Sequence, residues 1–363
     1  MLLYGAIIYF IIFIFIFEIR IRFDSFGGNS ERAVNQRFEK IVSLLFLTML
    51  WLLTAFRGNS IGNDTVTYIR YFERINNDGI NSIYSIELGF QWLIYFISRF
   101  TDNPHVFIVI ISTLLYIILG YIIYKNSKDL LVSCFLSFFL CFGAFCNIIR
   151  QSLAMMICFI GYTYLKSGKT KQFVLFVLLS SIFHKSALIV LLLLLFKYIP
   201  KSKMFFFGIS AIAILLSHTS VLLNLSHFFG DEYTGYFNSQ YANSGQLGTF
   251  LSLIKCVLIY LIIRISDNKN SQISEREYGI MYANTFFMFF FLCCGFTVNL
   301  ISRLADYFIL YSILDVPSAM QANNSKKCRI LFVSLFAYLI VHFLAVQFFR
   351  PEWNHLYPYE FWR

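Results

Sequence analysis

Charged residues are scarce in this sequence. Only 13% of its 363 residues are charged, whereas 58% are hydrophobic and 44 are Phe. A water-soluble domain with this balance could not cover its surface with polar side chains, so a soluble fold is excluded. At about 1.5 Å per residue, the apolar run at 330–349 is long enough to cross about 30 Å of hydrocarbon, and the run at 2–17 reaches about 24 Å. We therefore expect an all-α polytopic membrane protein.

The motifs of several protein classes are also missing. There is no Walker motif, no dinucleotide fingerprint, and no D-x-D or H-x-x-x-H pattern. No pair among the eight Cys has zinc spacing, and Cys293 with Cys294 is interpreted as apolar packing. We therefore expect no metal and no other cofactor. The net charge of +10 is attributed to cytoplasmic Lys and Arg that follow the positive-inside rule, not to a nucleic-acid partner.

The sequence also lacks the features that would divide it or shorten it. The first apolar run has no basic region before it and no small-residue cleavage site after it, so it is expected to be a membrane span and not a signal peptide. Internal repeats and low-complexity linkers are missing. We therefore expect residues 1–363 to form one transmembrane domain.

Clusters of Lys and Arg predict the path of the chain through the membrane. They lie at 20–40, 124–128, 165–171, 197–203, 264–277 and 325–329. When they are placed on the cytoplasmic side, the spans that connect them lie near 41–56, 106–124, 130–146, 149–165, 204–222, 248–266, 280–298, 303–316 and 330–348. This path predicts about 10–12 membrane segments. It places on the outer side both termini, the loops 57–105 and 223–247, and the tail 349–363.

Two segments do not fit a simple path. Residues 88–100 would reach only about 20 Å as a helix, so they are expected to form an interfacial or re-entrant helix on the outer side. Residues 172–198 are too long for one span and contain "HKS", so they are expected to enter the membrane and return as two short segments. Polar backbone at this depth is tolerated beside protein or a water-filled cavity. His184 and Lys185 are therefore expected to border an outward-facing cavity.

The predicted outer side carries several cations, which the positive-inside rule disfavours unless they have a partner. They are Arg57, Arg70, Arg74, Arg150, His184, Lys185, Arg303 and Arg350. Arg is suited to diphosphate because its planar fork makes two parallel hydrogen bonds to phosphate oxygens. Arg150 has Asn147 and Gln151 within one helical turn, which favours a binding site over a snorkelling anchor. We expect Arg150 to hold a lipid-linked phosphate.

Other candidates have structural alternatives that the sequence leaves open. Arg303 could form a local ion pair with Asp306 one turn later. His184 could be an ordinary hydrogen-bonding residue at a helix break, although its place in an apolar segment favours function. Asp64 could be a helix N-cap, and Glu87 could be a first-turn acid that complements the helix dipole.

Loops on the predicted outer side add weaker signals. Gly58 and Gly62 would allow a tight turn whose backbone lies close to a ligand. The Tyr-rich polar loop at 231–246 has a composition that suits sugars, and it is equally ordinary for an exposed loop. These features support a saccharide site without specifying one.

Five stretches of the chain, in this order, resemble the EpsG-like family of bacterial polysaccharide polymerases: "FRGNSIGNDTVTYIRYF", "ELGFQWL", "NIIRQSLA", "FHKSALI" and "YPYEFW". That family is grouped with the Wzy-type O-antigen and capsule polymerases. The most specific patterns are R-x-x-x-x-G-x-D-x-x-x-Y starting at Arg57, N-x-x-R-Q starting at Asn147, and H-K-S starting at His184. A later run at 303–308 is also similar to a motif of the family.

The resemblance implies a reaction and a fold. A growing glycan on undecaprenyl diphosphate would be the donor, and one lipid-linked repeat unit would be the acceptor, both at the outer face of the bacterial inner membrane. The transfer would be metal-independent and inverting, in a membrane fold similar to the lipid-dependent GT-C glycosyltransferases. A chain-length regulator and a flippase are implied partners. A ligase of finished glycan and a transporter of lipid-linked saccharide are the alternatives.

The resemblance also implies roles for residues. Arg57, Arg150 and Arg303, assisted by Lys185, would stabilise the leaving diphosphate. His184 or Asp64 would be the base, with a preference for His184 because a carboxylate near arginines is expected to be a weaker base. The supporting residues would be Tyr68, Arg70, Glu87, Asn147, Gln151, Asp306 and Tyr307.

Overall fold

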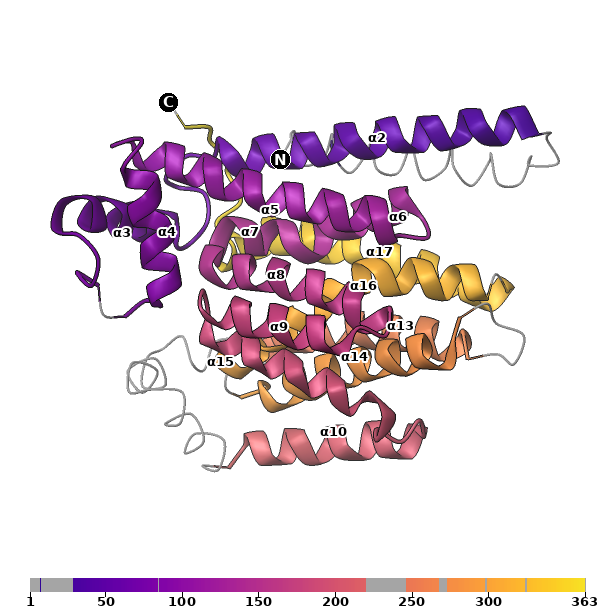
Figure 1. Cartoon of the computed structure of the whole chain (residues 1–363). Coiled ribbons are helices and arrows are strands. Elements are labelled where there is room, and N and C mark those ends of the chain that lie inside the picture. The colour runs from indigo at the N-terminus through magenta and orange to yellow at the C-terminus, as the bar shows by residue number, and fades with distance from the viewer. Residues whose placement is uncertain are drawn as a thin grey trace.

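The computed structural model describes residues 7, 29–83, 85–219, 246–267, 273–297, 299–323 and 325–362. The described part is a bundle of roughly parallel and antiparallel helices (Figure 1). Its longer elements are α2 (Asn29–Ala55), α5 (Pro104–Asn126), α8 (Ile149–Lys166), α9 (Thr170–Ser181), α10 (Lys203–Ser217), α13 (Gln246–Ile265), α14 (Glu275–Cys294), α16 (Ala305–Ala322) and α17 (Lys326–Phe349). Its shorter elements are α3 (Thr65–Asp78), α4 (Leu88–Ser98) and α15 (Asn299–Ser302).

One further rod is built from three pieces. α6 (Leu130–Ser137) continues through a π-helical turn, η1 (Phe138–Phe142), into α7 (Gly143–Asn147). Six segments are long and apolar enough to cross a membrane, namely Arg37–Ala55, Pro104–Asn126, Leu130–Asn147, Gln246–Ile265, Glu275–Cys294 and Lys326–Phe349. The chain is therefore an all-α multi-pass membrane protein, as its composition predicts.

Several predicted boundaries need correction. The basic loop expected at 20–40 is helical from Asn29 onward, where α2 begins. α14 begins at Glu275 and not near 280, because Ser274 caps it and two acids in its first turn complement the helix dipole. α16 extends to Ala322, past the predicted end at 316. The predicted first span and most of the loop 223–247 lie outside the described residues.

The two unusual segments form short elements with a break at the expected place, and their position relative to the membrane stays a prediction. α9 ends at Ser181, and a 3₁₀ helix, η2 (Lys185–Lys197), begins after the predicted break and packs back against α9. α4 is a short helix of 11 residues that packs on α3 and α5. α3 and α4 lie together at one end of the bundle, beside the start of α5, and the C-terminus lies at the same end (Figure 1).

The two ends of the bundle differ in charge. We call one the α3–α4 end; here α2, α9, α10, α14 and α17 finish, and α5, α8, η2, α13 and α16 begin. At the opposite end, the basic end, four elements finish on a cation in their last turn, namely Lys125, Lys166, Lys197 and Arg264. The candidate site residues that the structure describes lie at the α3–α4 end.

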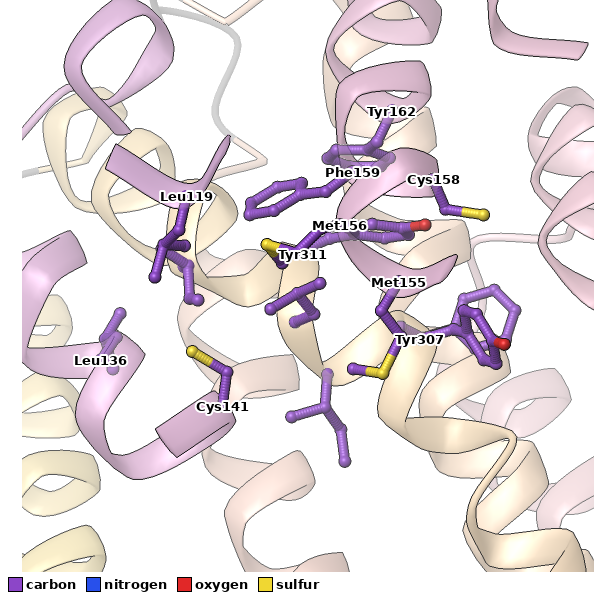
Figure 2. Packing of buried hydrophobic residues seen from close by; sticks show 14 of the residues in the cluster. Leu119, Leu136, Cys141, Met155, Met156, Cys158, Phe159, Tyr162, Tyr307 and Tyr311 are labelled. Carbon is purple, nitrogen blue, oxygen red and sulfur yellow. The ribbon is translucent and has the colours of Figure 1, made fainter. Parts of the chain in front are cut away.

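The middle of the bundle is packed with aromatic and sulfur-containing side chains. Figure 2 shows Met155, Met156 and Phe159 of α8 facing Tyr307 and Tyr311 of α16. The rings of Tyr162 and Tyr311 are stacked with centroids 4.2 Å apart. Within lipid such close van der Waals packing, and not hydrophobic burial, holds helices together. The packing fixes the first turns of α8 and α16, which carry candidate site residues.

Candidate functional site

Glu87 joins three segments of the chain at the α3–α4 end. Its Oε2 lies 2.7 Å from Nη1 of Arg150, in the first turn of α8. Its Oε1 lies 2.9 Å from Nδ1 of His184 and accepts a 3.2 Å hydrogen bond from the backbone N–H of Lys185. Glu87 occupies the N-cap position of α4, but its side chain does not cap that helix. The carboxylate is therefore committed to the two cationic segments and not to the helix dipole.

The surroundings of Glu87 favour its charged form. Burial alone would raise the pKa of the carboxyl, but the hydrogen bond and charge of His184, together with Arg150, lower the pKa to about 2. The Glu87 side chain is only 11% exposed. At any physiological pH it is an anion that orients both partners.

His184 has one ring nitrogen in use. Because Nδ1 faces a carboxylate oxygen, a neutral ring carries its proton on Nδ1 and leaves Nε2 as an acceptor. The side chain is 14% exposed, so it lies at the edge of the protein interior. A histidine oriented by a carboxylate in this way is suited to take a proton from a hydroxyl group.

Arg150 is held from two sides and keeps hydrogen-bonding capacity. Its backbone N–H donates to the Tyr68 hydroxyl at 3.4 Å, and burial raises the pKa of that hydroxyl to about 12, so it stays protonated. Nε of Arg150 is buried and has no hydrogen-bond partner in the described part of the chain. The ion pair with Glu87 argues against a simple anchor to lipid headgroups.

Asp64 lies near this cluster with an uncommitted carboxylate. It occupies the N-cap position of α3, yet its side chain makes no capping hydrogen bond, so the capping alternative is wrong. Burial raises the pKa of Asp64, and the nearby Arg303 and Arg150 only partly offset it. The expectation that arginines make Asp64 a weakened base is therefore wrong, because desolvation outweighs them.

Arg57 lies inside the protein. It is 1% exposed, its Nε donates to Oγ1 of Thr65 at 3.1 Å, and its Nη1 donates to the Thr54 carbonyl. These bonds tie the end of α2 to the start of α3. The guanidinium is not presented to a ligand in this structure, and its predicted contact with diphosphate stays a prediction.

The two glycines near Arg57 serve protein packing. Gly62 has a φ of +83°, and a Cβ there would lie 2.3 Å from the carbonyl oxygen of Cys146. A Cβ on Gly58 would lie 3.2 Å from the carbonyl oxygen of Glu360. The backbone at these positions thus approaches α7 and the C-terminal tail, and not an open ligand site as expected.

The C-terminal tail crosses the loop that carries Asp64. The backbone N–H groups of Gly58 and Gly62 donate to the carbonyls of Glu360 and His355 at 2.8 and 2.9 Å. Asn147 connects both parts, because its Oδ1 accepts from the backbone of Asn63 at 2.6 Å. Its Nδ2 donates to the tail carbonyl of residue 354 at 3.1 Å. Asn147 is thus a positioning residue.

The remaining predicted residues divide into two groups. Gln151 donates to the backbone carbonyl of Arg303, just before α16, at 2.9 Å, and the hydroxyl of Tyr307 in α16 lies 3.1 Å from Oγ of Ser186. Exposed or half-buried positions are occupied by Arg70, Lys185, Arg303 and Asp306. Arg70 has no hydrogen bond or ion pair with any described residue, and the structure does not bring it into the Glu87 cluster. Arg74 and Arg350 pair locally with Asp78 and Glu352.

Two buried charges were missed by sequence reasoning. Lys255 lies in the middle of α13, and Asp315 lies in α16, where it accepts hydrogen bonds from Tyr162 and Asn284. The available signal was a single charge inside an apolar run, which marks a functional or pairing residue in membrane helices. Within the described ranges, no group of three or more His, Cys, Asp and Glu could hold a metal ion.

Comparison with protein families finds a match to the EpsG family. The model of the EpsG family covers residues 40–361, which is nearly the whole chain, and this family is associated with polysaccharide polymerases. No curated protein and no solved structure matches the chain significantly.

Proposed function

Because this chain belongs to the EpsG family, we propose that it is a membrane glycosyltransferase that polymerises lipid-linked oligosaccharide repeat units. The donor is the growing glycan on undecaprenyl diphosphate, and the acceptor is one repeat unit on the same carrier. The observation that carries the proposal is the Glu87 carboxylate, which holds Arg150 and His184 on its two oxygens. This arrangement supports the proposal, because the reaction needs a cation for the leaving group and a base for the nucleophile.

The α3–α4 end is the outer face in this proposal. The basic end carries the cations that the positive-inside rule assigns to the cytoplasm. Both lipid-linked substrates would then meet the site from the outer leaflet of the bacterial inner membrane, in a fold of the GT-C type.

The reaction is a single displacement. The hydroxyl at the non-reducing end of the acceptor attacks the anomeric carbon of the donor, and a new C–O bond forms with inversion. The bond from that carbon to the diphosphate breaks, and its electron pair leaves with the lipid diphosphate. Nε2 of His184 accepts the hydroxyl proton, because Glu87 holds the ring by Nδ1.

Fixed cations stabilise the charge that develops on the leaving diphosphate. Arg150 offers its unpartnered Nε, and Arg303 and Lys185 lie at the same end of the bundle. Such preorganised donors are most effective where water is scarce, which allows the reaction to proceed without a divalent metal. Asp64, whose carboxylate lies near Arg303 and Arg150, binds a sugar hydroxyl or serves as the second candidate base.

Polymer length in cells tests the proposal. A strain that lacks this gene is complemented with Arg150→Ala, Arg150→Lys, His184→Ala or Asp64→Ala at matched protein levels. The control is Arg74→Ala, because Arg74 lies at the same end and pairs only loosely, at 4.0 Å, with Asp78. We expect each alanine variant of the site to leave single repeat units without a ladder, and the control to keep the ladder.

Each other outcome has a defined meaning. Failure of Arg150→Lys would point to bidentate binding of phosphate, since Lys keeps the charge but not the fork. Intact ladders in the site variants would show that these residues are structural and that the site is wrong. Loss of even the single-unit product on gene deletion would favour transport over polymerisation.

A further inference from the structure

Lys255 is a mostly buried cation without a hydrogen-bond or ion-pair partner among the described residues. It is 8% exposed and lies in α13, about 14 Å along the helix from Gln246 at about 1.5 Å per residue. It makes no hydrogen bond or ion pair with any residue that the structure describes. A charged side chain in a membrane helix is unfavourable unless something compensates it, and such residues mark binding sites and ion pathways.

The same chain shows how a buried structural lysine is satisfied. At the basic end, Nζ of Lys166 lies 2.9 Å from Oε1 of Glu277 and 3.3 Å from Oδ1 of Asp315. These ion pairs join α8 to α14 and α16. Lys255 has no corresponding partners in the part of the chain that the structure describes, so pairing between the described helices does not account for it.

The groups around Lys255 connect it to the proposed site. α13 packs against α15, α16 and α17. The ammonium is close enough for its charge to act on Asp306 in the first turn of α16 and on His342 of α17. Arg303 acts on the same Asp306. Lys255 therefore places a positive charge deeper in the bundle, along α13 from the α3–α4 end.

The charges alternate in sign from α13 to the Glu87 cluster. Arg303 influences Asp64 as well as Asp306, and Arg150 influences Asp64 as well as Glu87. The order is Lys255, Asp306, Arg303, Asp64, Arg150, Glu87 and His184. Of these seven residues Lys255 is the most buried, and it makes no hydrogen bond or ion pair with any described residue.

We propose that Lys255 is a phosphate-binding residue that contacts the diphosphate of a polyprenyl-linked substrate. This inference rests on the proposed polymerase function and adds a ligand from α13 to the cations near Glu87. An ammonium in a water-poor site makes charge-assisted hydrogen bonds to phosphate oxygens, which compensate its burial when the ligand is present. The alternative is that Lys255 only neutralises Asp306 at a distance.

The test measures binding and thermal stability of the purified protein in detergent. The probe is farnesyl diphosphate, a short polyprenyl diphosphate, and the variants are Lys255→Met, Lys255→Gln and Arg264→Met. The last is a matched control because it removes one cation from the basic end of the same helix. Phosphatidylglycerol serves as a second probe, since a phospholipid headgroup could supply the same phosphate chemistry.

The proposal predicts three results together. Lys255→Met binds farnesyl diphosphate at least about tenfold more weakly, as expected for one charge-assisted hydrogen bond, while Arg264→Met binds like the native protein. The Tm of Lys255→Met without ligand does not fall, because an uncompensated buried charge has been removed. Farnesyl diphosphate stabilises the native protein more than phosphatidylglycerol does. Lys255→Gln gives the same pattern if the Met variant fails to fold.

Four results would overturn it. A lower ligand-free Tm with unchanged binding would show that Lys255 is a counterion of Asp306. Equal stabilisation by phosphatidylglycerol would assign the site to a structural lipid. If both Lys255 variants bind farnesyl diphosphate and polymerise as the native protein does, the inference about Lys255 fails and the proposed function stands. If the native protein binds no polyprenyl diphosphate, both the inference and the proposed function fail.

Discussion

Replacement of Glu87 by Gln is the sharpest test of the site. Gln keeps the size of the side chain and one carbonyl oxygen, but it removes the charge that Arg150 and His184 share. Arg150 would lose its anionic partner, and because the amide has one acceptor oxygen where the carboxylate has two, either Arg150 or His184 would face an NH2 group in place of an acceptor. We expect the polymer ladder to disappear even though neither the proposed base nor the proposed cation has been changed.

The structure gives the size of the effect on stability. The pKa of Glu87 falls from 4.5 to about 2 in the folded protein, and at about 1.4 kcal/mol per tenfold change in proton affinity this corresponds to about 3 kcal/mol. Solvent at the edge of the site screens part of this, so we expect a loss of about 2 kcal/mol. A loss of this size lowers Tm by about 3 °C in a chain of this length.

The sign of the pH dependence follows from the lowered pKa. The stabilisation by the Glu87 carboxylate is complete above the unfolded value of 4.5 and is lost as the pH falls toward 2. The difference in Tm between the native protein and Glu87→Gln should therefore be constant from pH 8 to about pH 5 and should shrink below that.

The matched control is Glu352→Gln at the same end of the bundle. Glu352 pairs with Arg350 at 3.6 Å, but both side chains are more than half exposed. Exposed pairs contribute only about 0–1 kcal/mol, so this variant should keep its Tm and its ladder. If Glu87→Gln behaves like Glu352→Gln in both assays, the carboxylate neither holds the site together nor orients a base, and the reasoning is refuted.

Three further predictions address other parts of the site. Asp64→Asn should abolish the ladder, while its Tm at neutral pH should be equal to or above that of the native protein. The reason is that burial raises the pKa of the Asp64 carboxyl, which has no hydrogen bond among the described residues. The gain in Tm should vanish below the unfolded pKa of 3.8. An equal loss of Tm at all pH values would contradict this. Removal of residues 351–363 deletes three backbone hydrogen bonds between the tail and the segment that leads to Asp64. At about 1 kcal/mol for each bond, the free energy of unfolding should fall by about 3 kcal/mol, and the ladder should be lost. An unchanged ladder would show that the tail is dispensable. Cys introduced at Asn77 should react with an impermeant maleimide in intact cells, whereas Cys introduced at Lys169 should react only after permeabilisation. The native protein should give little background labelling, because all eight native Cys are buried. The reverse labelling pattern would invert the proposed topology.

The sequence predicts the elements of the fold well where polar residues interrupt apolar runs. The break at His184 could be predicted because three polar residues inside a 27-residue apolar segment leave no continuous span of suitable length. Helix ends were predicted less well. The start of α14 depends on Ser274 and on acids that hydropathy alone assigns to a loop, since polar first turns extend helices beyond the apolar window.

Contacts between distant residues account for most of what the sequence could not predict. Glu87 and His184 are 97 positions apart, and nothing in either motif indicates that they meet. Arg57 shows the converse difficulty. A cation at the end of a span has the same sequence signature whether it faces a ligand or the protein interior, and here Thr54 and Thr65 hold it inside. The pKa of Asp64 likewise depends on burial, which composition does not show.

The two ends of the bundle can be distinguished by how completely their buried charges are satisfied. At the basic end, the Asp315 carboxylate accepts hydrogen bonds from Tyr162 at 2.7 Å, Asn284 at 3.0 Å and Lys166 at 3.3 Å. Among the described residues, the two buried guanidinium nitrogens without a partner, on Arg57 and Arg150, both lie at the α3–α4 end. Buried polar groups in folded proteins are normally paired. This contrast supports the proposed anionic ligand, for which Nε of Arg150 is the unused donor beside the Glu87 cluster, whereas the unpartnered nitrogen of Arg57 lies inside the protein.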